Sequence, residues 1–374
     1  MPPPARPDVG LAGQLRAATD EELVAILAAA DEADIAIHRP DRHPGSGTGV
    51  QVARPMPATV EIVLLGALGC RHGMLAGGAG GYLVRTPATS VLVDPGPAAL
   101  GMLVQLADRF SWAEVDAIAC THFHPDHYTD VIPCLEGMTS HATGTGRKLL
   151  AANPTVAARF TAFSPYHAGG MADVVTLAHA TTDGTGEPSV KIGDLTIHAT
   201  PAVHTEEKGR NRSAIGLALD TPAGGIWYTS DTNLADGLLS AVNDLLPDIT
   251  LVIAHADASN IRREPGRAGL CHLETRDVPT IAAALRPRHV VIQHYDAAYS
   301  AARYRIAQAV WLQRQLDRDG LPTQVLPAAS GLHITLGRDG ISGWRIHLGS
   351  AAAPAISDYL QSALGPCHRC SLLG

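Results

Sequence analysis

The residues that most constrain this chain are 121–127, which read Thr-His-Phe-His-Pro-Asp-His and follow a strand-like apolar run. Three imidazoles and a carboxylate on one short turn cannot all reach a single metal ion, but they can serve two ions side by side. His122 and His124 would then face one ion, and Asp126 and His127 the other. The alternative is a solvated, histidine-rich loop, which the candidate ligands downstream make the weaker interpretation.

Segments on either side of this cluster pair an apolar run with one polar residue at or beyond its end. Upstream, Asp94 ends an apolar run that starts at Ser90. Downstream, His204, Asp231 and His294 stand in a similar relation to later strand-like runs. Taken singly, each would be as well explained as a buried polar residue whose hydrogen bonds are satisfied. Their order relative to the cluster makes a common metal site the better explanation.

Together these segments resemble the motifs of the metallo-β-lactamase superfamily, in order from about Thr59 to about Leu336. The resemblance implies an αββα sandwich, with two sheets face to face and helices outside, and the α/β alternation along the chain agrees. It also implies a first metal held by His122, His124 and His204, a second held by Asp126, His127 and His294, and a bridge between them formed by Asp231. Asp94 would orient ligands rather than bind a metal.

The ligand set that the resemblance implies is chemically consistent with two divalent ions. Neutral imidazoles suit zinc, which is our first choice, and manganese and iron are the alternatives because they also accept carboxylate and imidazole. A bridging carboxylate lets two ions lie about 3.5–4 Å apart, and water shared by them becomes a hydroxide nucleophile near neutral pH. A strong protein base is then unnecessary.

Differences between this chain and the motifs of related families reduce the number of activities to expect. Where Ser230 and Asp231 stand, the β-lactamases of the superfamily carry a cysteine, so the resemblance argues against antibiotic hydrolysis. Where His124 stands, the diiron flavoproteins carry a glutamate, which argues against a redox role. The full histidine set together with Asp231 resembles the phosphodiesterase, nuclease and lactonase branches.

The segment 269–275, Gly-Leu-Cys-His-Leu-Glu-Thr, resembles a motif shared by tRNA 3′-end nucleases and small cyclic phosphodiesterases. This chain departs from the motif at Glu274, where the family has Ser or Thr. In that motif the histidine approaches the leaving-group oxygen of a phosphodiester, so His272 as an imidazolium would protonate the departing alkoxide. The alternative for His272 is a structural, hydrogen-bonding histidine.

Basic residues gather in two loops next to these motifs, and we expect a phosphate or carboxylate clamp there, with ordinary solvated loops as the alternative. The candidate substrate-binding residues of these loops are Arg210, Arg212, Arg263 and Arg267. The interval from His204 to Asp231 leaves no room for the long arm that tRNA nucleases carry at this point. The resemblance therefore favours a compact or cyclic phosphodiester over tRNA.

Two regions lie outside the motif pattern. Residues 133–190 are a candidate lid, through which Tyr166 and His167 would reach the substrate. Near the C-terminus, Cys367 and Cys370 form a Cys-x-x-Cys pair, and the chain has no second such pair. A flexible tail is the favoured interpretation, since a zinc site there would need two subunits to share an ion.

Three regions divide the chain. Residues 1–57 are a Pro-rich extension, in which a capping box and helical spacing predict one amphipathic helix that ends near Ala36. We expect the hydrolase domain over 58–345 and a C-terminal tail over 346–374. Within the domain, the Gly-rich run 76–81 predicts a tight turn, because the Lys-Ser/Thr of a phosphate cradle does not follow it.

The composition predicts a soluble, cytoplasmic protein. At a net charge of −8 the chain offers no basic field for long nucleic acids. The N-terminal sequence lacks the apolar core of a signal peptide, and no apolar stretch reaches membrane-spanning length. The six cysteines are spread as expected in a reducing compartment. A small anionic molecule is the expected partner, and a homodimer is expected from the resemblance alone.

These observations predict a dinuclear metal-dependent hydrolase that cleaves a small or cyclic nucleotide-like phosphodiester, with Asp126 and His272 as its catalytic residues. A carboxylic-ester, lactone or thioester hydrolase on the same metals is the first alternative, because that reaction would require neither His272 nor the arginines. An RNA-processing nuclease is the second. A non-catalytic binding protein on the same fold is the third, and the complete ligand set argues against it.

Overall fold

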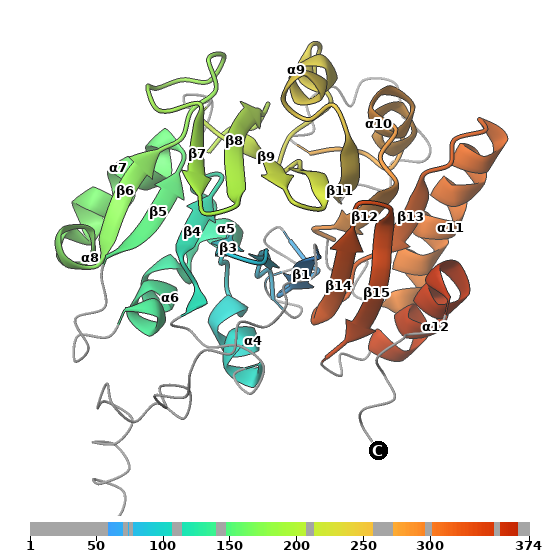
Figure 1. Cartoon of the computed structure of the whole chain (residues 1–374), viewed down its shortest axis with the longest axis horizontal. Helices are drawn as coiled ribbons and strands as arrows, with labels where there is room; N and C mark the ends of the chain where they lie inside the picture. The colour runs from blue at the N-terminus through green and yellow to red at the C-terminus, as the bar shows by residue number, and fades with distance from the viewer. Residues whose placement is uncertain are drawn as a thin grey trace, which may run out of the picture. The chain divides into compact units, whose positions relative to one another are not determined.

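The computed structural model describes residues 59–69, 74, 78–106, 114–139, 147–206, 213–256, 272–295, 301–347 and 352–365. These residues belong to one unit, which spans 55–139 and 146–374. They form two β-sheets with helices packed against them (Figure 1). The helix predicted in the N-terminal extension lies outside the described residues.

The first sheet contains eight strands in the order β15-β14-β1-β2-β3-β4-β5-β6. Their bounds are β1 Val60–Leu64, β2 Tyr82–Arg85, β3 Ser90–Val93, β4 Ala117–Cys120, β5 Lys148–Ala152, β6 Ala172–Thr176, β14 Leu332–Gly337 and β15 Gly340–Ile346. The four strands from β3 to β6 pair in parallel. Parallel strands end at the same edge of a sheet, so the loop after β4 is carried to that edge.

The second sheet contains seven strands in the order β13-β12-β11-β10-β9-β8-β7. Their bounds are β7 Ser189–Ile192, β8 Leu195–Pro201, β9 Ile215–Thr221, β10 Gly224–Tyr228, β11 Ile249–His255, β12 His289–Gln293 and β13 Gln324–Pro327. The strands from β10 to β13 pair in parallel, whereas β7 to β10 pair antiparallel. The carboxyl ends of β10, β11 and β12 therefore lie side by side.

The helices are α4 Ala99–Gln105, α5 Pro125–Tyr128, α6 Val131–Met138, α7 Pro154–Phe163, α8 Pro165–Gly170, α9 Leu238–Leu245, α10 Asp277–Leu285, α11 Ala302–Arg318 and α12 Ala353–Leu364. In Figure 1, α10, α11 and α12 accompany the strands β11 to β15, and α4, α6, α7 and α8 accompany β3 to β6. None of the helices in the described part of the chain is both long and apolar enough to cross a membrane.

Alternating apolar side chains explain why the first sheet is covered on both faces. In β3, Val91 and Val93 belong to the large core that also contains Trp227 of the second sheet. The residue between them, Leu92, belongs to a separate core together with Leu103 of α4. Successive residues of a strand point to opposite faces, so one short apolar run serves two cores. The arrangement of helix, sheet, sheet and helix confirms the predicted αββα sandwich.

The Gly-rich run forms the tight backbone that its sequence predicted, as far as it is described. Gly78 and Gly81 have φ angles of 99° and 60°, in the left-handed region that favours glycine. A Cβ atom on Gly81 would lie 2.0 Å from the carbonyl oxygen of Val93, so a side chain does not fit. The run thus brings β2 close to the end of β3, where Asp94 follows.

Most of the candidate lid, residues 133–190, is instead part of the sandwich. β5 and β6 extend the first sheet in parallel beyond β4, and Leu150 and Phe160 lie in the core on its outer face. These strands carry no polar motif, so the sequence pattern does not distinguish them as part of the sheet. His167 lies on α8 and forms an ion pair with Glu136 of α6, 2.8 Å away.

The predicted C-terminal tail, 346–374, also contains regular structure. α12 buries Ile356 and Leu360 completely, and the hydroxyl of Tyr359 donates to the carbonyl oxygen of Val325 in β13 at 3.1 Å. The apolar face of this helix covers β13, so the domain continues past the boundary that the sequence suggested. Cys367 and Cys370 lie outside the described residues.

Candidate metal centre

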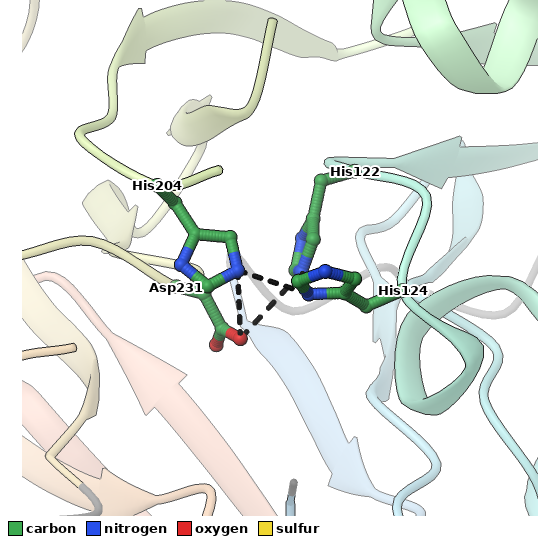
Figure 2. A group of neighbouring side chains, drawn as sticks. All are labelled: His122, His124, His204 and Asp231. Atoms are coloured by element: carbon green, nitrogen blue, oxygen red, sulfur yellow. Dashed lines mark hydrogen bonds and ion pairs between the residues drawn. The ribbon is translucent and has the colours of Figure 1, made fainter. Parts of the chain in front are cut away.

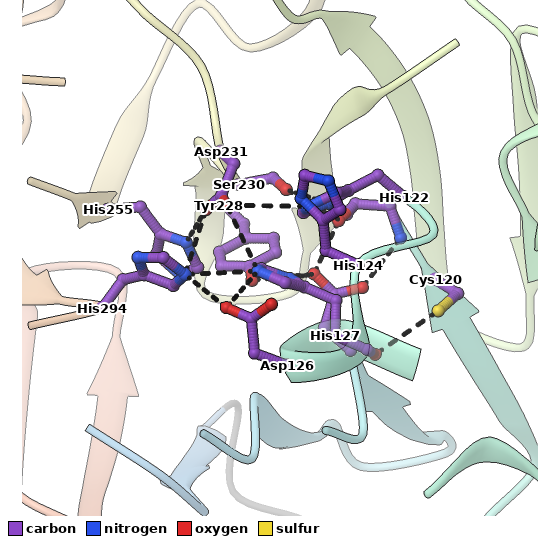
Figure 3. A network of polar contacts seen from close by, with 12 residues as sticks. Cys120, His122, His124, Asp126, His127, Tyr228, Ser230, Asp231, His255 and His294 are labelled. Atoms are coloured by element: carbon purple, nitrogen blue, oxygen red, sulfur yellow. Dashed lines mark hydrogen bonds and ion pairs between the residues drawn. The ribbon is translucent and has the colours of Figure 1, made fainter. Parts of the chain in front are cut away.

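The candidate ligands lie where strands of both sheets end. β4 ends at Cys120, a loop carries His122 and His124, and the four-residue helix α5 carries Asp126 and His127. Pro125 occupies the first turn of α5, where its missing N–H costs nothing, and it fixes the turn that separates the two pairs. The local sequence therefore directs the pairs to different places, as Figures 2 and 3 show.

A first set of ligand atoms comes from His122, His124, His204 and Asp231 (Figure 2). Nδ1 of His124 lies 3.2 Å from Nε2 of His122 and 2.9 Å from Nε2 of His204. Oδ2 of Asp231 lies 3.5 Å from Nε2 of His122 and 3.7 Å from Nε2 of His204. Four donor atoms thus converge on one small space.

A second set comes from Asp126, His127 and His294 with the same Asp231 (Figure 3). Nε2 of His294 lies 3.0 Å from Oδ2 of Asp126, 3.3 Å from Nε2 of His127 and 3.3 Å from Oδ1 of Asp231. Nε2 of His127 lies 3.5 Å from both Asp126 and Asp231. Asp231 therefore borders both sets, in the position of a bridging carboxylate.

These separations fit tetrahedral metal sites. Zinc bonds of about 2.0–2.1 Å in tetrahedral geometry place neighbouring ligand atoms about 3.3 Å apart. The separations given above run from 2.9 to 3.7 Å in the first set and from 3.0 to 3.5 Å in the second, and all ligand atoms of the first set lie within 4.8 Å of one another. Imidazole nitrogens and carboxylate oxygens are also the donors that zinc, manganese and iron accept. The residues present therefore suit two divalent ions.

Burial lowers the pKa of two histidines of the first set, which keeps their rings in the neutral form that binds a metal. It lowers the pKa of His122 to about 4 and that of His204 to about 3, so both rings are neutral at physiological pH. A neutral imidazole has a free lone pair, and that form binds metals.

Around the second set, the pKa shifts favour an ionised carboxylate on Asp231 and a positive charge on His127. Burial opposes the ionisation of Asp231, but the rings of His294, His272 and His127 around it keep its pKa well below the usual value. Burial likewise opposes a charge on His127, yet Asp231, Asp126 and Asp94 raise its pKa well above the usual value. Several buried carboxylates around one ring attract a positive charge to this place, and a metal ion would supply it.

Asp94 lies behind the second set. Its Oδ2 is 2.8 Å from Nδ1 of His127 and accepts a hydrogen bond of 2.8 Å from the hydroxyl of Tyr228. Both Asp94 oxygens also accept from Thr121, from the backbone N–H at 2.7 Å and from the hydroxyl at 2.6 Å. A carboxylate with these contacts orients a ligand from outside the metal sphere, in keeping with the expectation for Asp94.

Backbone strain is concentrated at this edge of the sandwich. Asp94, Ser230 and His294 have φ angles of 47°, 53° and 65°, which are uncommon for residues other than glycine. Each such residue costs of the order of 1–3 kcal/mol, and the surrounding structure must hold it in place. All three either belong to a ligand set or adjoin one, so the strain lies where the side chains must converge.

His272 reaches the same centre from the segment before α10. Its Nε2 lies 3.2 Å from Oδ2 of Asp231, and its ring stacks on His204 with a centroid separation of 5.2 Å. Its side chain is 17% exposed, compared with 2% for His204. His272 thus lies on the solvent side of the cluster, where a substrate would approach.

Two residues near the centre were missed by the sequence analysis. His255, at the end of β11, has Nδ1 2.9 Å from Oδ1 of Asp231. Glu206 accepts a hydrogen bond of 2.7 Å from the backbone N–H of Phe123, between the two histidines of the loop. A signal existed for His255, because it ends a long apolar strand as His294 nearly does, whereas Glu206 stands five residues beyond the end of β8.

Among the predicted substrate-binding residues, the structure describes His167 but none of the four arginines. Arg210, Arg212, Arg263 and Arg267 lie outside the described residues. His167 does not point to the cluster as expected, since its Nε2 faces Glu136 and its Nδ1 contacts Ser164. The polar sequence around His167 suggested a contact with the substrate. The packing of α8 beside β6 instead directs the ring toward Glu136 and Ser164.

Comparison with known proteins decides the family. The family described as "Beta-lactamase superfamily domain" matches residues 89–295, a segment that begins just before β3 and ends just after His294. The chain belongs to the metallo-β-lactamase superfamily. The matched segment contains all seven residues of the two ligand sets, and His255 as well.

Individual members of the superfamily are distant from this chain. The uncharacterized protein MJ1374 of Methanocaldococcus jannaschii is 26% identical over 285 residues, which cover 74% of this chain and 95% of that protein. A diphosphatase from the PhnP family has a TM-score of 0.52 at 16% identity, with 74% of this chain and 97% of that chain covered. Human tRNase Z, short form, has a TM-score of 0.53 at 15% identity, with 73% and 98% covered. At these identities the two structures establish a shared fold.

The superfamily and the site together define the chain at a coarse level. It is a metallo-β-lactamase-fold hydrolase with a cluster of histidines and aspartates suited to divalent metal ions.

Proposed function

We propose that this chain is a metal-dependent phosphodiesterase that acts on a small or cyclic nucleotide-like phosphodiester. The observation that carries the proposal is His272, whose Nε2 lies 3.2 Å from the carboxylate common to both ligand sets. It is also more exposed than the buried rings of His122, His204 and His294, which are each 3% exposed or less. His272 is thus a proton donor beside the metals that need not be a ligand itself.

Cleavage of a phosphodiester with an alkoxide leaving group requires a proton donor, and His272 is placed to be that donor. When bound, two divalent ions would supply an activated water and offset the negative charge that develops on the phosphoryl group. An alkoxide leaving group is a strong base and needs a proton as its bond to phosphorus breaks. His272 would bind at the leaving-group side and donate that proton from its ring.

The surroundings support a compact substrate over a folded RNA. Between His204 and Asp231, the described residues form the hairpin of β9 and β10 within the second sheet. A protruding arm is missing from that part of the interval, and the net charge of −8 offers no extended basic surface. A small anionic substrate is therefore the partner we propose, and zinc is the metal we propose first.

Leaving groups of different basicity test the role of His272. We expect the zinc- or manganese-loaded protein to hydrolyse phosphodiesters with nitrophenyl and with alkyl leaving groups. His272→Ala should slow the alkyl substrate about 10²–10⁴-fold, because alkoxide needs a general acid. The nitrophenyl substrate should slow far less, because nitrophenolate leaves without a proton. Metal content should be measured beside the rates to show that both ions are retained.

The same assay distinguishes the alternatives. An activated carboxylic ester and a lactone should be tested with the same protein. Turnover of these substrates alone would reject the phosphodiesterase and favour an ester or lactone hydrolase on the same metals. Equal losses for both phosphodiester leaving groups in His272→Ala would reject proton donation by His272.

A further inference from the structure

His255 lies outside the two ligand sets that the resemblance implies, although its ligand atom and those of His127, Asp231 and His294 all lie within 4.8 Å of one another. It ends β11, its side chain is 3% exposed, and its Nδ1 lies 2.9 Å from Oδ1 of Asp231 (Figure 3). The second set is already four donors without it, since Asp126, His127, His294 and Asp231 show separations of 3.0–3.5 Å. The ring must therefore be either a fifth ligand or a partner of the carboxylate.

The contacts of the ring favour a partner of the carboxylate. Within the described residues, Asp231 is the one polar group that the ring contacts within hydrogen-bond distance, and Nε2 is buried without a partner. An oxygen that only accepts requires the proton on Nδ1. Nδ1 is thus committed as a donor to Oδ1 and has no lone pair for a metal.

The ring is also held firmly in this orientation. It stacks on His294 with centroids 4.4 Å apart and an interplanar angle of 20°, and it meets the edge of Tyr228 at 4.8 Å. The backbone N–H of His255 donates to the hydroxyl of Thr229 at 3.0 Å, which ties the end of β11 to the segment that carries Asp231. The donor is therefore fixed in place before any metal binds.

We propose that His255 is a positioning residue that sets the rotation of the Asp231 carboxylate. A carboxylate that bridges two ions can give one oxygen to each ion or share a single oxygen between them, and the broad terminal torsion of aspartate does not select its rotation by itself. With His255 beside Oδ1, Oδ2 lies toward both sets, 3.5 Å from Nε2 of His122 and 3.5 Å from Nε2 of His127. His255 would thereby hold Oδ1 beside His294 and strengthen binding of the second ion. This inference concerns the metal centre and is independent of the substrate proposed above.

Asparagine and glutamine at position 255 form a matched pair for the test. The amide nitrogen of asparagine is attached where Nδ1 is attached in histidine, so His255→Asn keeps a donor for Oδ1. The amide nitrogen of glutamine lies one bond farther along, so His255→Gln loses it. Both variants remove the stacking on His294 and both are neutral and polar, which leaves the position of the donor as the difference.

We expect His255→Asn to bind two ions with nearly the affinity of the unaltered protein. In His255→Gln the first ion should bind normally and the second about 10–100-fold more weakly, the usual effect of losing a partner of a metal ligand. Affinities for both ions should be measured by chelator competition. In the dimanganese form, electron paramagnetic resonance should show unaltered coupling between the ions in His255→Asn and altered coupling in His255→Gln.

Two outcomes would overturn the proposal. Loss of the second ion in His255→Asn as severe as in His255→Gln would make His255 a metal ligand. Retention of both ions with unaltered coupling in His255→Gln would show that the contact with Asp231 has no effect. Circular dichroism should confirm folding, and if His255→Gln does not fold, the metal content and coupling of His255→Asn decide the matter alone.

Discussion

At the scale of single residues, Asp94 lies behind His127, one of the candidate metal ligands. Its Oδ2 is 2.8 Å from Nδ1 of His127. A carboxylate can only accept, so the proton of the ring is held on Nδ1 and Nε2 is left free toward the second set. This contact fixes the tautomer of His127 that can bind a metal.

Asp94→Asn should therefore weaken the second metal site with little change in shape. An amide nitrogen facing His127 would donate to Nδ1 and move the ring proton to Nε2, which blocks the metal-binding lone pair. We expect a loss of metal affinity of about 10–100-fold. Chelator competition with zinc or manganese would measure it.

Tyr228→Phe provides the matched control for that substitution. It removes another donor to the same oxygen, 2.8 Å away, without changing the tautomer of His127. Its metal affinity should stay within a few-fold of the unaltered protein. Tight binding of two ions by Asp94→Asn would contradict this account of Asp94.

At the scale of elements, the site depends on connections between the ends of strands in different sheets. Glu206 follows β8 of the second sheet, and its carboxylate accepts from the N–H of Phe123 at 2.7 Å and from the side-chain amide of Asn153 at 2.8 Å. It also accepts from the hydroxyl of Ser213. One side chain thereby joins the loop after β4, the end of β5 and the segment before β9.

Glu206→Ala should disturb the first metal site, because it leaves the N–H of Phe123 without its acceptor between His122 and His124. Unsatisfied buried groups of this kind cost about 1–3 kcal/mol each, so the unfolding temperature should fall and the first ion should bind more weakly. Glu206→Gln should restore both, since its oxygen can accept and its amide can donate to Ser213. A Gln variant as impaired as Ala would mean that the negative charge matters instead.

At the scale of the whole molecule, the candidate ligands come from both sheets. His122, His124, Asp126 and His127 follow β4 of the first sheet, whereas His204, Asp231 and His294 follow strands of the second. Ions held between these groups would cross-link two layers that otherwise meet through apolar side chains. Metal binding should therefore stabilise the entire fold.

Removal of metal should lower the unfolding temperature in calorimetry. A ligand at 100 times its dissociation constant stabilises a protein by about 2.7 kcal/mol, which corresponds to several degrees for a domain of this size. His204→Ala should reduce the shift, and His167→Ala, outside the site, should keep it. Equal unfolding temperatures with and without a chelator would contradict the cross-link.

Where the signal was local, the sequence predicted the fold, and it also predicted candidate ligands whose side chains the structure brings together. The apolar runs at 60–65, 91–93 and 116–120 became β1, β3 and β4, because short apolar stretches beside turns are typical of buried strands. The lid over 133–190 and the tail over 346–374 were misread, because β5, β6 and α12 carry no motif and owe their structure to packing.

The sequence by itself determined the chemistry of the centre, because the identities and order of its histidines and aspartates allow few other uses. Only the tertiary structure decided which side chains support that centre. His255 contacts a residue 24 positions away, and Glu206 one 83 positions away. Such contacts depend on how strands of two sheets end beside each other, and that arrangement arises from burial across the sandwich rather than from any local pattern.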